Sequence, residues 1–251
     1  MADKCVNREH VALAEREVSH RESADGHTNV SCYPRQAVDA KFLYIVLELS
    51  PASFEDIIER RDDKHPELCK IFDCFNPKRA LRDITSGLGH LHSNGIVHRD
   101  IKPQNILVLI SNSNEGELCM VISDLGLSRK LESGETSFEP TVGSEGTVGW
   151  MAPEILRSRG TRTMEGGQTL RLTKSVDIFA LGCLGYYCLT GGKHPYGDLT
   201  ECEDNILRDQ KSLQDLEGLD EDVPEAVDLI TSMLAYKAAD RCVCPSQLLH
   251  C

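Results

Sequence analysis

Runs of apolar residues predict strands in the first half of the chain. Residues 42–49 are apolar at every position except one, and half of them are β-branched or aromatic. This run predicts a buried strand, which a Ser-Pro pair ends. Shorter apolar runs at 96–97, 106–109 and 121–122, each beside a polar turn, predict further strands.

Helical spacing predicts helices from residue 53 onward. Ser53 is a candidate N-cap, and the acidic residue three positions later completes a capping box. Asn76 and the proline after it begin a longer helix, which an Asn-Gly pair ends. Its apolar face consists of Leu81, Ile84, Leu88 and Leu91. Residues 176–189 predict a buried helix, and residues 226–234 an amphipathic one.

Two segments have a weaker pattern. Residues 4–24 are charged and carry only a faint helical stripe. Residues 127–173 are polar and glycine-rich around one apolar island at 150–151, and we expect the basic stretch 157–173 to be a disordered surface loop. Since strands come early and helices late, the pattern predicts an α+β fold with a helical lower body.

Composition and charge narrow the class of protein. The 251 residues suit one compact domain, or two lobes sharing a core. The 27 Lys and Arg against 40 Asp and Glu give a net charge of −13, which argues against direct nucleic-acid binding. No apolar run reaches the about 18 residues of a membrane span, and the start has no apolar signal segment. We therefore expect a soluble, cytoplasmic chain.

The eleven cysteines are odd in number, scattered, and without a Cys-x-x-Cys pair. Together with a cytoplasmic location, this favours reduced thiols. A disulfide framework or a zinc site remains an alternative.

One polar loop carries the residue types that phosphoryl transfer requires. Asp100, Lys102 and Asn105 lie within six residues between short apolar runs, and Asp124 follows before a glycine turn. A carboxylate orients the attacking hydroxyl, a cation neutralises the moving phosphoryl group, and amide and carboxylate oxygens hold Mg²⁺. The pattern therefore indicates phosphoryl transfer.

Three motifs follow one another: His-Arg-Asp at 98–100, Asp-Leu-Gly at 124–126 and Ala-Pro-Glu at 152–154. In this order they resemble the signature of the eukaryotic protein kinases. Trp150 and the Asp-Ile-Phe at 177–179 narrow the resemblance to the kinase domain of the inositol-requiring enzyme family, the stress sensors of the endoplasmic reticulum. We call residues 98–105 the catalytic loop and residues 124–154 the activation segment.

The resemblance implies a bilobal fold, with residues 1–49 as an incomplete β-rich N-lobe and residues 50–251 as a helical C-lobe. It implies a serine/threonine kinase that uses ATP and Mg²⁺ and acts on a protein substrate or on a second copy of itself. In a full-length sensor, the domain would lie on the cytosolic face of the endoplasmic reticulum membrane.

The resemblance also assigns roles to single residues. Asp100 matches the catalytic base and Lys102 the phosphate-neutralising lysine, while Asn105 and Asp124 match the Mg²⁺ ligands. Around adenine, Leu107 matches the apolar floor and Leu47 the gatekeeper. In the hinge, backbone groups at Glu48 and Ser50 match those that bind the adenine edge.

Lys4 and Glu17 match the phosphate-binding lysine and its glutamate partner; the alternative is two ordinary surface charges. Because no glycine-rich loop precedes Lys4 and no endoribonuclease domain follows, the chain resembles a kinase domain shortened at both ends. On that basis we expect weak or absent phosphotransfer and no RNA cleavage.

Two further features follow from the resemblance. Glu154 and Arg241 match a buried ion pair of the lower lobe; an exposed pair is the alternative. The activation segment carries several hydroxyls, among them Thr147 and Ser137, and Ser137 matches an autophosphorylation site. A phosphate there would pair with Arg99 and Arg129; a merely polar, flexible loop is the alternative.

Three functions stay open at this point. The first is an active serine/threonine kinase that phosphorylates itself in trans during the unfolded protein response. The second is a pseudokinase-like module that binds nucleotide or a partner, and the third is an inactive fragment. The four residues of the phosphoryl-transfer pattern favour the first.

Overall fold

The structure of the chain is a computed structural model. It describes residues 2–7, 18–20, 23–24, 26–31, 35–38, 42–47, 49–60, 73–110, 117–140, 146–159, 170–216 and 223–241. In the three strands before residue 48, it describes the backbone alone.

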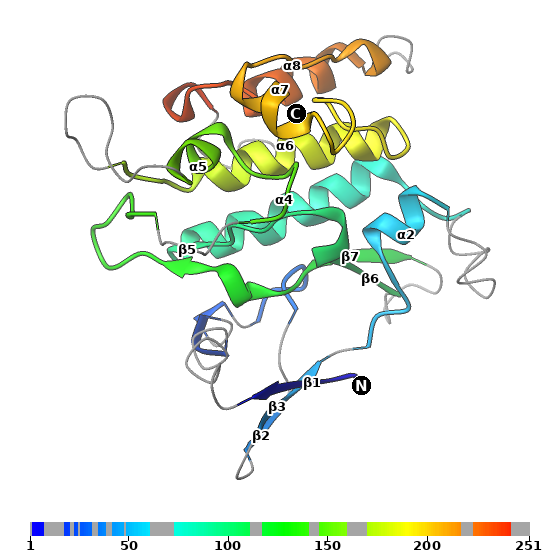
Figure 1. The fold of residues 1–251 in the computed structure, drawn as a ribbon. Coiled ribbons are helices and arrows are strands. Elements are labelled where there is room, and N and C mark those ends of the chain that lie inside the picture. The colour runs from blue at the N-terminus through cyan, green and yellow to red at the C-terminus, as the bar shows by residue number, and fades with distance from the viewer. Residues whose placement is uncertain are drawn as a thin grey trace.

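Three strands form a small antiparallel sheet at one end of the molecule (Figure 1). They are β1 (Ala2–Asn7), β2 (Arg35–Val38) and β3 (Phe42–Leu47), in the order β1-β3-β2. β3 confirms the strand predicted over 42–49. β1 pairs with β3 along its whole length, so Lys4 lies on a strand although its charged surroundings fit a helix.

A second sheet lies against the helical body and confirms the strand runs predicted after residue 100. It consists of β4 (Ala52–Ser53), β6 (Ile106–Ile110) and β7 (Leu118–Ile122), in the order β4-β6-β7. Because strand side chains alternate between faces, Ile106 and Val108 are buried in the core whereas Leu107 is only half-buried. A separate pair joins β5 (Ile96–Val97) to β8 (Arg129–Lys130).

The helices of the body are α2 (Phe54–Ile58), α4 (Pro77–Ser93), α5 (Pro153–Ser158), α6 (Ser175–Leu189), α7 (Cys202–Leu207) and α8 (Val223–Met233). Single 3-10 turns occur at Pro103–Asn105, Leu125–Leu127, Gln214–Leu216 and Ala238–Asp240. Both predicted caps are present: Ser53 and Asn76 each accept a hydrogen bond from a backbone N–H three residues on. α6 is buried over almost its whole length and packs against α4 and α8 (Figure 1).

The polar segment 127–173 contains more structure than its sequence pattern indicates. It includes β8 and α5, and its Phe138 pairs with Leu172 in an isolated antiparallel bridge. The expected surface loop over 157–173 is therefore wrong at both ends, since Arg157 lies in α5 and Leu170 and Leu172 are buried. α5 has only six residues, too few to show a helical period.

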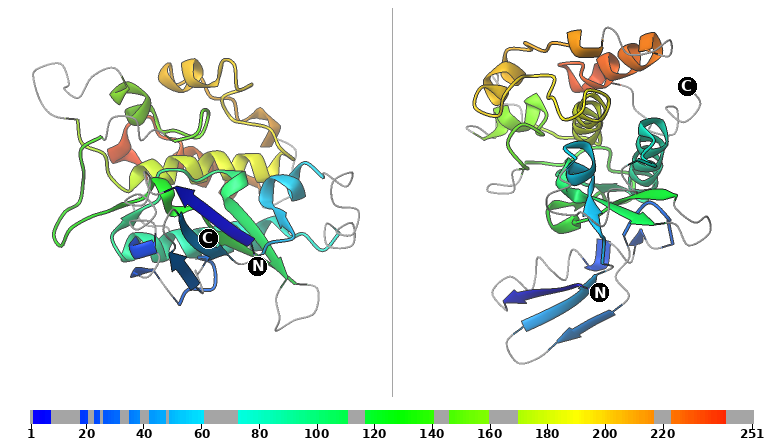
Figure 2. Two further views of the ribbon diagram at one scale, coloured as in Figure 1. Left: turned by 60° about the horizontal axis from the view of Figure 1, so that its bottom comes forward. Right: turned by 90° about the vertical axis from the view of Figure 1, so that its right-hand side faces the viewer.

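The small sheet β1–β3 and the helical body occupy opposite ends of the molecule (Figure 2). This arrangement confirms the predicted α+β fold class, whereas the boundary between residues 49 and 50 stays a prediction. No helix in the described part of the chain is long and apolar enough to cross a membrane.

Candidate active site

The catalytic loop is fastened to the helical core by one buried carboxylate. Asp177, in the first turn of α6, is 1% exposed and accepts hydrogen bonds from the backbone N–H groups of His98 (2.8 Å) and Arg99 (2.7 Å). His92 of α4 donates its Nε2 proton to the same carboxylate at 2.8 Å. Burial opposes ionisation, but the bond from His92 and these backbone bonds hold the pKa of Asp177 below its usual value. Arg99 adopts a left-handed φ of 71°, which this anchoring stabilises.

Asp100 is held in a fixed orientation by four hydrogen-bond donors. Its Oδ2 accepts from Lys102 Nζ at 2.7 Å and from Asn105 Nδ2 at 2.9 Å. Its Oδ1 accepts from the backbone N–H of Thr147 at 3.0 Å and from the Thr147 hydroxyl at 2.7 Å. Burial raises the pKa of Asp100, but the bonds from Lys102 and Thr147 outweigh it and lower the pKa overall. The carboxylate is therefore ionised at neutral pH.

Lys102 links the catalytic loop to the activation segment. Its ammonium group donates to Asp100 and also to Thr147 Oγ1 at 2.5 Å. The structure thus brings Asp100 and Lys102 into contact with Thr147, which lies 47 positions after Asp100 in the sequence. A cation lies directly beside the oriented carboxylate.

Asn105 and Asp124 are joined by the pairing of β6 with β7. Ser123 donates from its backbone N–H and from its hydroxyl to the Asn105 carbonyl, both at 2.9 Å. Asp124 follows at once, with a left-handed φ of 58°, and its exposed carboxylate accepts from the Gly126 N–H at 3.3 Å. Its backbone turn directs the chain out of β7 into the activation segment.

The donor set of this pair fits Mg²⁺. Both amide protons used by Asn105 point to Asp100, which leaves the amide oxygen as its ligand atom, and Asp124 supplies carboxylate oxygens. Mg²⁺ prefers such oxygen ligands and in nucleotide sites uses one or two protein groups plus phosphates and water. Within the described ranges, no cluster of three or more His, Cys, Asp or Glu side chains offers a different metal site.

The predicted adenine-side residues are placed in part. Leu107 lies on the face of β6 opposite the core, as an apolar floor requires. The Ser50 hydroxyl donates to the Val108 carbonyl at 2.8 Å and accepts from the Val108 N–H at 3.1 Å, so it ties the hinge to β6. Leu47 ends β3. Glu48 and Glu17 lie outside the described residues.

Glu154 and Arg241 form a bidentate ion pair, with nitrogen–oxygen distances of 2.7 and 2.9 Å. The Arg241 side chain is fully buried, and it also donates to the Ser175 carbonyl at 3.0 Å. The pair therefore connects α5, the start of α6 and the end of the last 3-10 turn. It fastens the end of the activation segment to the helical body.

The comparison with protein families identifies the fold. The protein kinase domain family matches residues 1–251. The chain belongs to the protein kinase domain family. The catalytic loop, the Asn105–Asp124 pair and the buried Glu154–Arg241 pair are therefore parts of a kinase domain.

Curated relatives of this kinase domain include one sensor for unfolded proteins and two serine/threonine-protein kinase/endoribonucleases. Identity is 38% with the "Sensor for unfolded proteins in the ER ire1" of Schizosaccharomyces pombe, over 96% of the chain and 23% of that protein. It is 38% with "Serine/threonine-protein kinase/endoribonuclease ire-1" of Caenorhabditis elegans, over 100% and 24%. It is 39% with "Serine/threonine-protein kinase/endoribonuclease IRE2" of Homo sapiens, over 100% and 25%. The kinase domain spans about a quarter of the length of these relatives.

Sequence reasoning missed several residues that support the kinase site. Asp177 entered only as a family marker, and its role as anchor depends on folding across 78 positions to Arg99. His20 is buried and bonds Ser128 at 2.7 Å, beside the Asp-Leu-Gly turn. The Ser137 hydroxyl accepts a hydrogen bond from Arg171, a residue that sequence reasoning did not single out, and the pairing of a phosphate with Arg99 and Arg129 stays a prediction. None of these contacts leaves a periodic signal in the sequence.

Proposed function

We propose that this kinase domain transfers the γ-phosphate of ATP to serine and threonine hydroxyls of proteins, beginning with a second copy of itself. The observation that carries the proposal is the Asp100 carboxylate, oriented by Lys102, Thr147 and Asn105. Phosphoryl transfer depends mostly on positioning and electrostatics, and this arrangement supplies both.

The substrate hydroxyl oxygen forms a bond to the γ-phosphorus while the bond from that phosphorus to the β–γ bridging oxygen breaks. ADP leaves with the bonding electron pair, and the hydroxyl proton passes to Asp100. Lys102, 2.7 Å from that carboxylate, neutralises charge on the transferred group. Asn105 and Asp124 would hold Mg²⁺, and a bound Mg²⁺ would neutralise charge on the phosphate oxygens. A lowered pKa makes Asp100 a weak base, which suits a residue that orients the hydroxyl and takes the proton late.

Two lines support a serine/threonine kinase of the stress-sensor type. The catalytic loop resembles that of serine/threonine kinases through Lys102, and the relatives from C. elegans and Homo sapiens carry that activity in their names. The S. pombe relative is named as a sensor for unfolded proteins in the endoplasmic reticulum. We infer that the domain works in the unfolded protein response, on the cytosolic face of that membrane.

Mixing two copies of different length tests the proposal. The recipient is a tagged, longer Asp100→Asn chain, and the donor is the unsubstituted chain with ATP labelled on the γ-phosphate and Mg²⁺. Label on serine or threonine of the recipient, at Ser137 first, is the expected result. Label on tyrosine alone, or equal labelling of the recipient without the donor, would overturn the proposal.

A further inference from the structure

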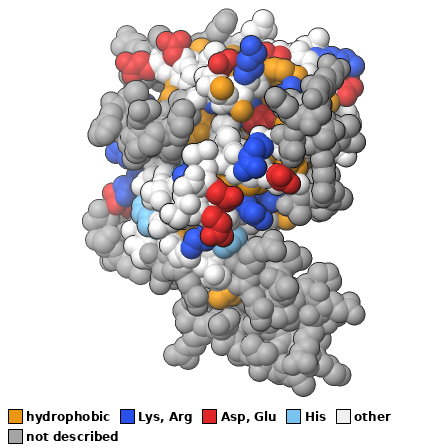
Figure 3. Space-filling model, turned by 90° about the vertical axis from the view of Figure 1, so that its left-hand side faces the viewer, with side chains coloured by type: hydrophobic (Ala, Val, Ile, Leu, Met, Phe, Trp, Pro, Cys, Tyr) orange, Lys and Arg blue, Asp and Glu red, His pale blue; other side chains and the backbone are white. Residues whose placement is uncertain are grey.

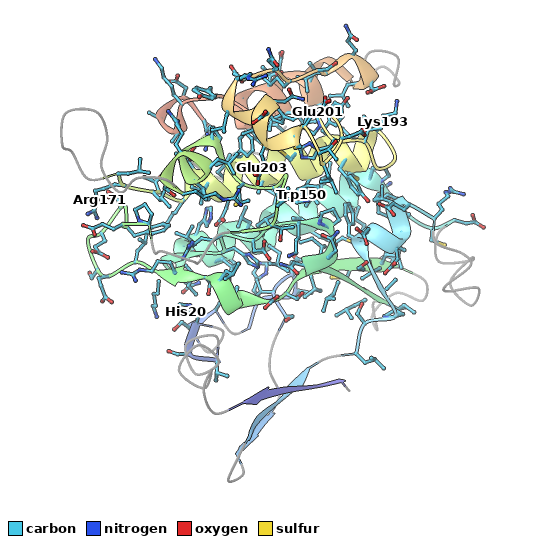
Figure 4. The ribbon with its side chains drawn as sticks, in the orientation of Figure 1. His20, Trp150, Arg171, Lys193, Glu201 and Glu203 are labelled. Carbon is cyan, nitrogen blue, oxygen red and sulfur yellow. The ribbon has the colours of Figure 1, made fainter. Side chains whose placement is uncertain are left out.

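Arg171 holds Ser137 of the activation segment through two hydrogen bonds. Its Nε donates to the Ser137 hydroxyl at 2.6 Å, and its Nη2 donates to the Ser137 carbonyl at 2.6 Å. Two donors of one planar guanidinium group therefore contact one residue, and these two contacts fix the orientation of the guanidinium plane beside the Ser137 hydroxyl. Arg171 lies at the edge of the molecule, on the chain that leads into α6 (Figure 4).

The backbone fixes this contact independently of the two side chains. The neighbouring residues Phe138 and Leu172 exchange both backbone hydrogen bonds, each at 2.8 Å, and both are 2% exposed. The guanidinium of Arg99 lies 5.6 Å from the centre of the Phe138 ring. Ser137 and Arg171 each precede a residue of this buried bridge, so they lie diagonally across it, within reach of the long Arg171 side chain.

Arg171 differs in its partner from two other arginines of the helical body. Arg159 pairs with Glu203 at 2.8 Å, and Arg241 pairs with Glu154. Among the described residues, Arg171 forms no ion pair with a carboxylate, and its guanidinium group contacts the Ser137 hydroxyl and carbonyl instead. On this side of the molecule, acidic and basic side chains are interspersed rather than gathered into one basic region (Figure 3). An anion at Ser137 would therefore meet one guanidinium group, that of Arg171.

We propose that Arg171 is the binding residue for a phosphate on Ser137. Phosphorylation adds a charge of about −1.5 to −2 and three acceptor oxygens at the atom that Arg171 already contacts. A hydrogen bond from a cation to a neutral hydroxyl then becomes an ion pair with bidentate hydrogen bonds. The site stays open to water because the Arg171 side chain is exposed, so the phosphate is not buried on binding.

The contact between Arg171 and a phosphate on Ser137 would be linked to the catalytic loop through α6. Arg171 lies four residues before α6 begins, and Asp177 in the first turn of α6 holds the backbone of His98 and Arg99. A phosphate on Ser137 therefore ties the middle of the activation segment to the element that fastens the catalytic loop. This inference rests on the proposed function for the source of the phosphate, but not for its test.

Phosphoserine installed at position 137 during translation makes the test independent of the domain's own activity. The full chain carries Asp100→Asn, so that no other site is phosphorylated, and phosphorus NMR follows the phosphate titration. With Arg171 present, we expect the second phosphate pKa to lie below its usual value of about 6. Arg171→Gln should return it toward that value, and Arg171→Lys should give an intermediate value.

Two controls define the site. Arg129→Gln removes an arginine that the sequence favoured, and phosphoserine at the exposed Ser133 places the phosphate away from Arg171. Arg129→Gln should leave the pKa of the phosphate on Ser137 unchanged. The pKa of a phosphate on Ser133 should be the same with and without Arg171. An unchanged phosphate pKa in both Arg171 variants, or a rise caused by Arg129→Gln instead, would overturn the assignment. If Arg171→Gln does not fold, the comparison of Arg171→Lys with the unsubstituted chain decides.

Discussion

At the scale of single residues, the active site shows hydrogen bonds outweighing burial. Asp100 and Asp177 are both buried, which by itself would favour their neutral forms, yet donors around each carboxylate lower both pKa values. The two carboxylates have different tasks. Asp177 accepts from two backbone N–H groups of the catalytic loop and fixes that loop, whereas three of the four donors to Asp100 are side-chain groups.

The Asp124 carboxylate allows a prediction on nucleotide binding. Asp124→Ala should weaken binding of Mg-ATP at least tenfold, a change of about 1.4 kcal/mol, because one of two metal ligands is lost. Binding of adenosine, which has no phosphates, should change little. Titration calorimetry with both ligands measures this, and Asp228→Ala on the exposed face of α8 is the matched control. Equal losses for ATP and adenosine would argue against a metal-ligand role.

The buried His194 allows a prediction of how the stability of the folded chain depends on pH. Its ring lies edge-on to Trp150, central in Figure 4, and its Nδ1 is 3.3 Å from Cys202 Sγ. Burial lowers the pKa of His194 to about 4. The unfolded chain binds a proton near pH 6.5 and the folded chain does not, so stability is full above pH 6.5 and falls between pH 6.5 and 4. The total loss is roughly 3 kcal/mol.

Urea unfolding at several pH values checks this prediction. His194→Gln removes the titrating group, so the slope of unfolding free energy between pH 6.5 and 4 should flatten. The carboxylates with lowered pKa values contribute to the loss mainly below that window. An identical slope in the two proteins would show that His194 is not the group responsible.

At the scale of elements, glycines in α6 set how closely α8 packs. A Cβ at Gly182 would lie 2.8 Å from Met233 Cβ, which cannot move without the helix backbone, and 3.0 Å from Leu234 Cδ2. A Cβ at Gly185 would lie 3.6 Å from its nearest neighbour, Ile230. Close approach of the two helices therefore depends on the first glycine only.

Gly182→Ala should lower the free energy of unfolding by about 1–3 kcal/mol through overpacking. Gly185→Ala should leave it unchanged or raise it, because alanine favours a helix by up to about 1 kcal/mol over glycine. Thermal unfolding of the two variants, which carry the same chemical change three residues apart, compares them directly. Equal melting temperatures would contradict the packing described for α6 and α8.

Elements with many local signals were predictable from the sequence. α4 has a cap, a proline at its first position and a regular apolar face, and α6 is apolar throughout. α5 and α7 have six residues each, and β8 exists only through its pairing with β5. Such elements depend on distant partners, which no local pattern records.

The candidate site divides in the same way. Asp100, Lys102, Asn105 and Asp124 were predictable because their chemistry is concentrated in two short motifs. The contacts that orient them come from residues such as Thr147 and Asp177, tens of positions away, and are set by the tertiary fold. The pairing of Lys4 with Glu17 stays a prediction.

At the scale of the whole molecule, residues 49–53 connect the small sheet to the helical body. Ser50 fastens this connection to β6 through the Val108 backbone. Asn105 precedes β6 and Asp124 follows β7, and the bonds from Ser123 to the Asn105 carbonyl hold these two strand ends together. The proposed function assigns the adenine floor to Leu107, the metal ligands to Asn105 and Asp124, and the catalytic carboxylate to Asp100.

The central claim is that Asp100 acts in phosphoryl transfer and not in nucleotide binding. The most direct test measures two quantities on the same preparations: the single-turnover rate of phosphate transfer and the affinity for Mg-ATP, in the unsubstituted chain and in Asp100→Asn. The exposed Asp215→Asn is the control. We predict that Asp100→Asn lowers the rate by a factor of about 100 or more, while the affinity changes less than about twofold. A rate unaffected by Asp100→Asn, or no transfer by the unsubstituted chain, would contradict the account.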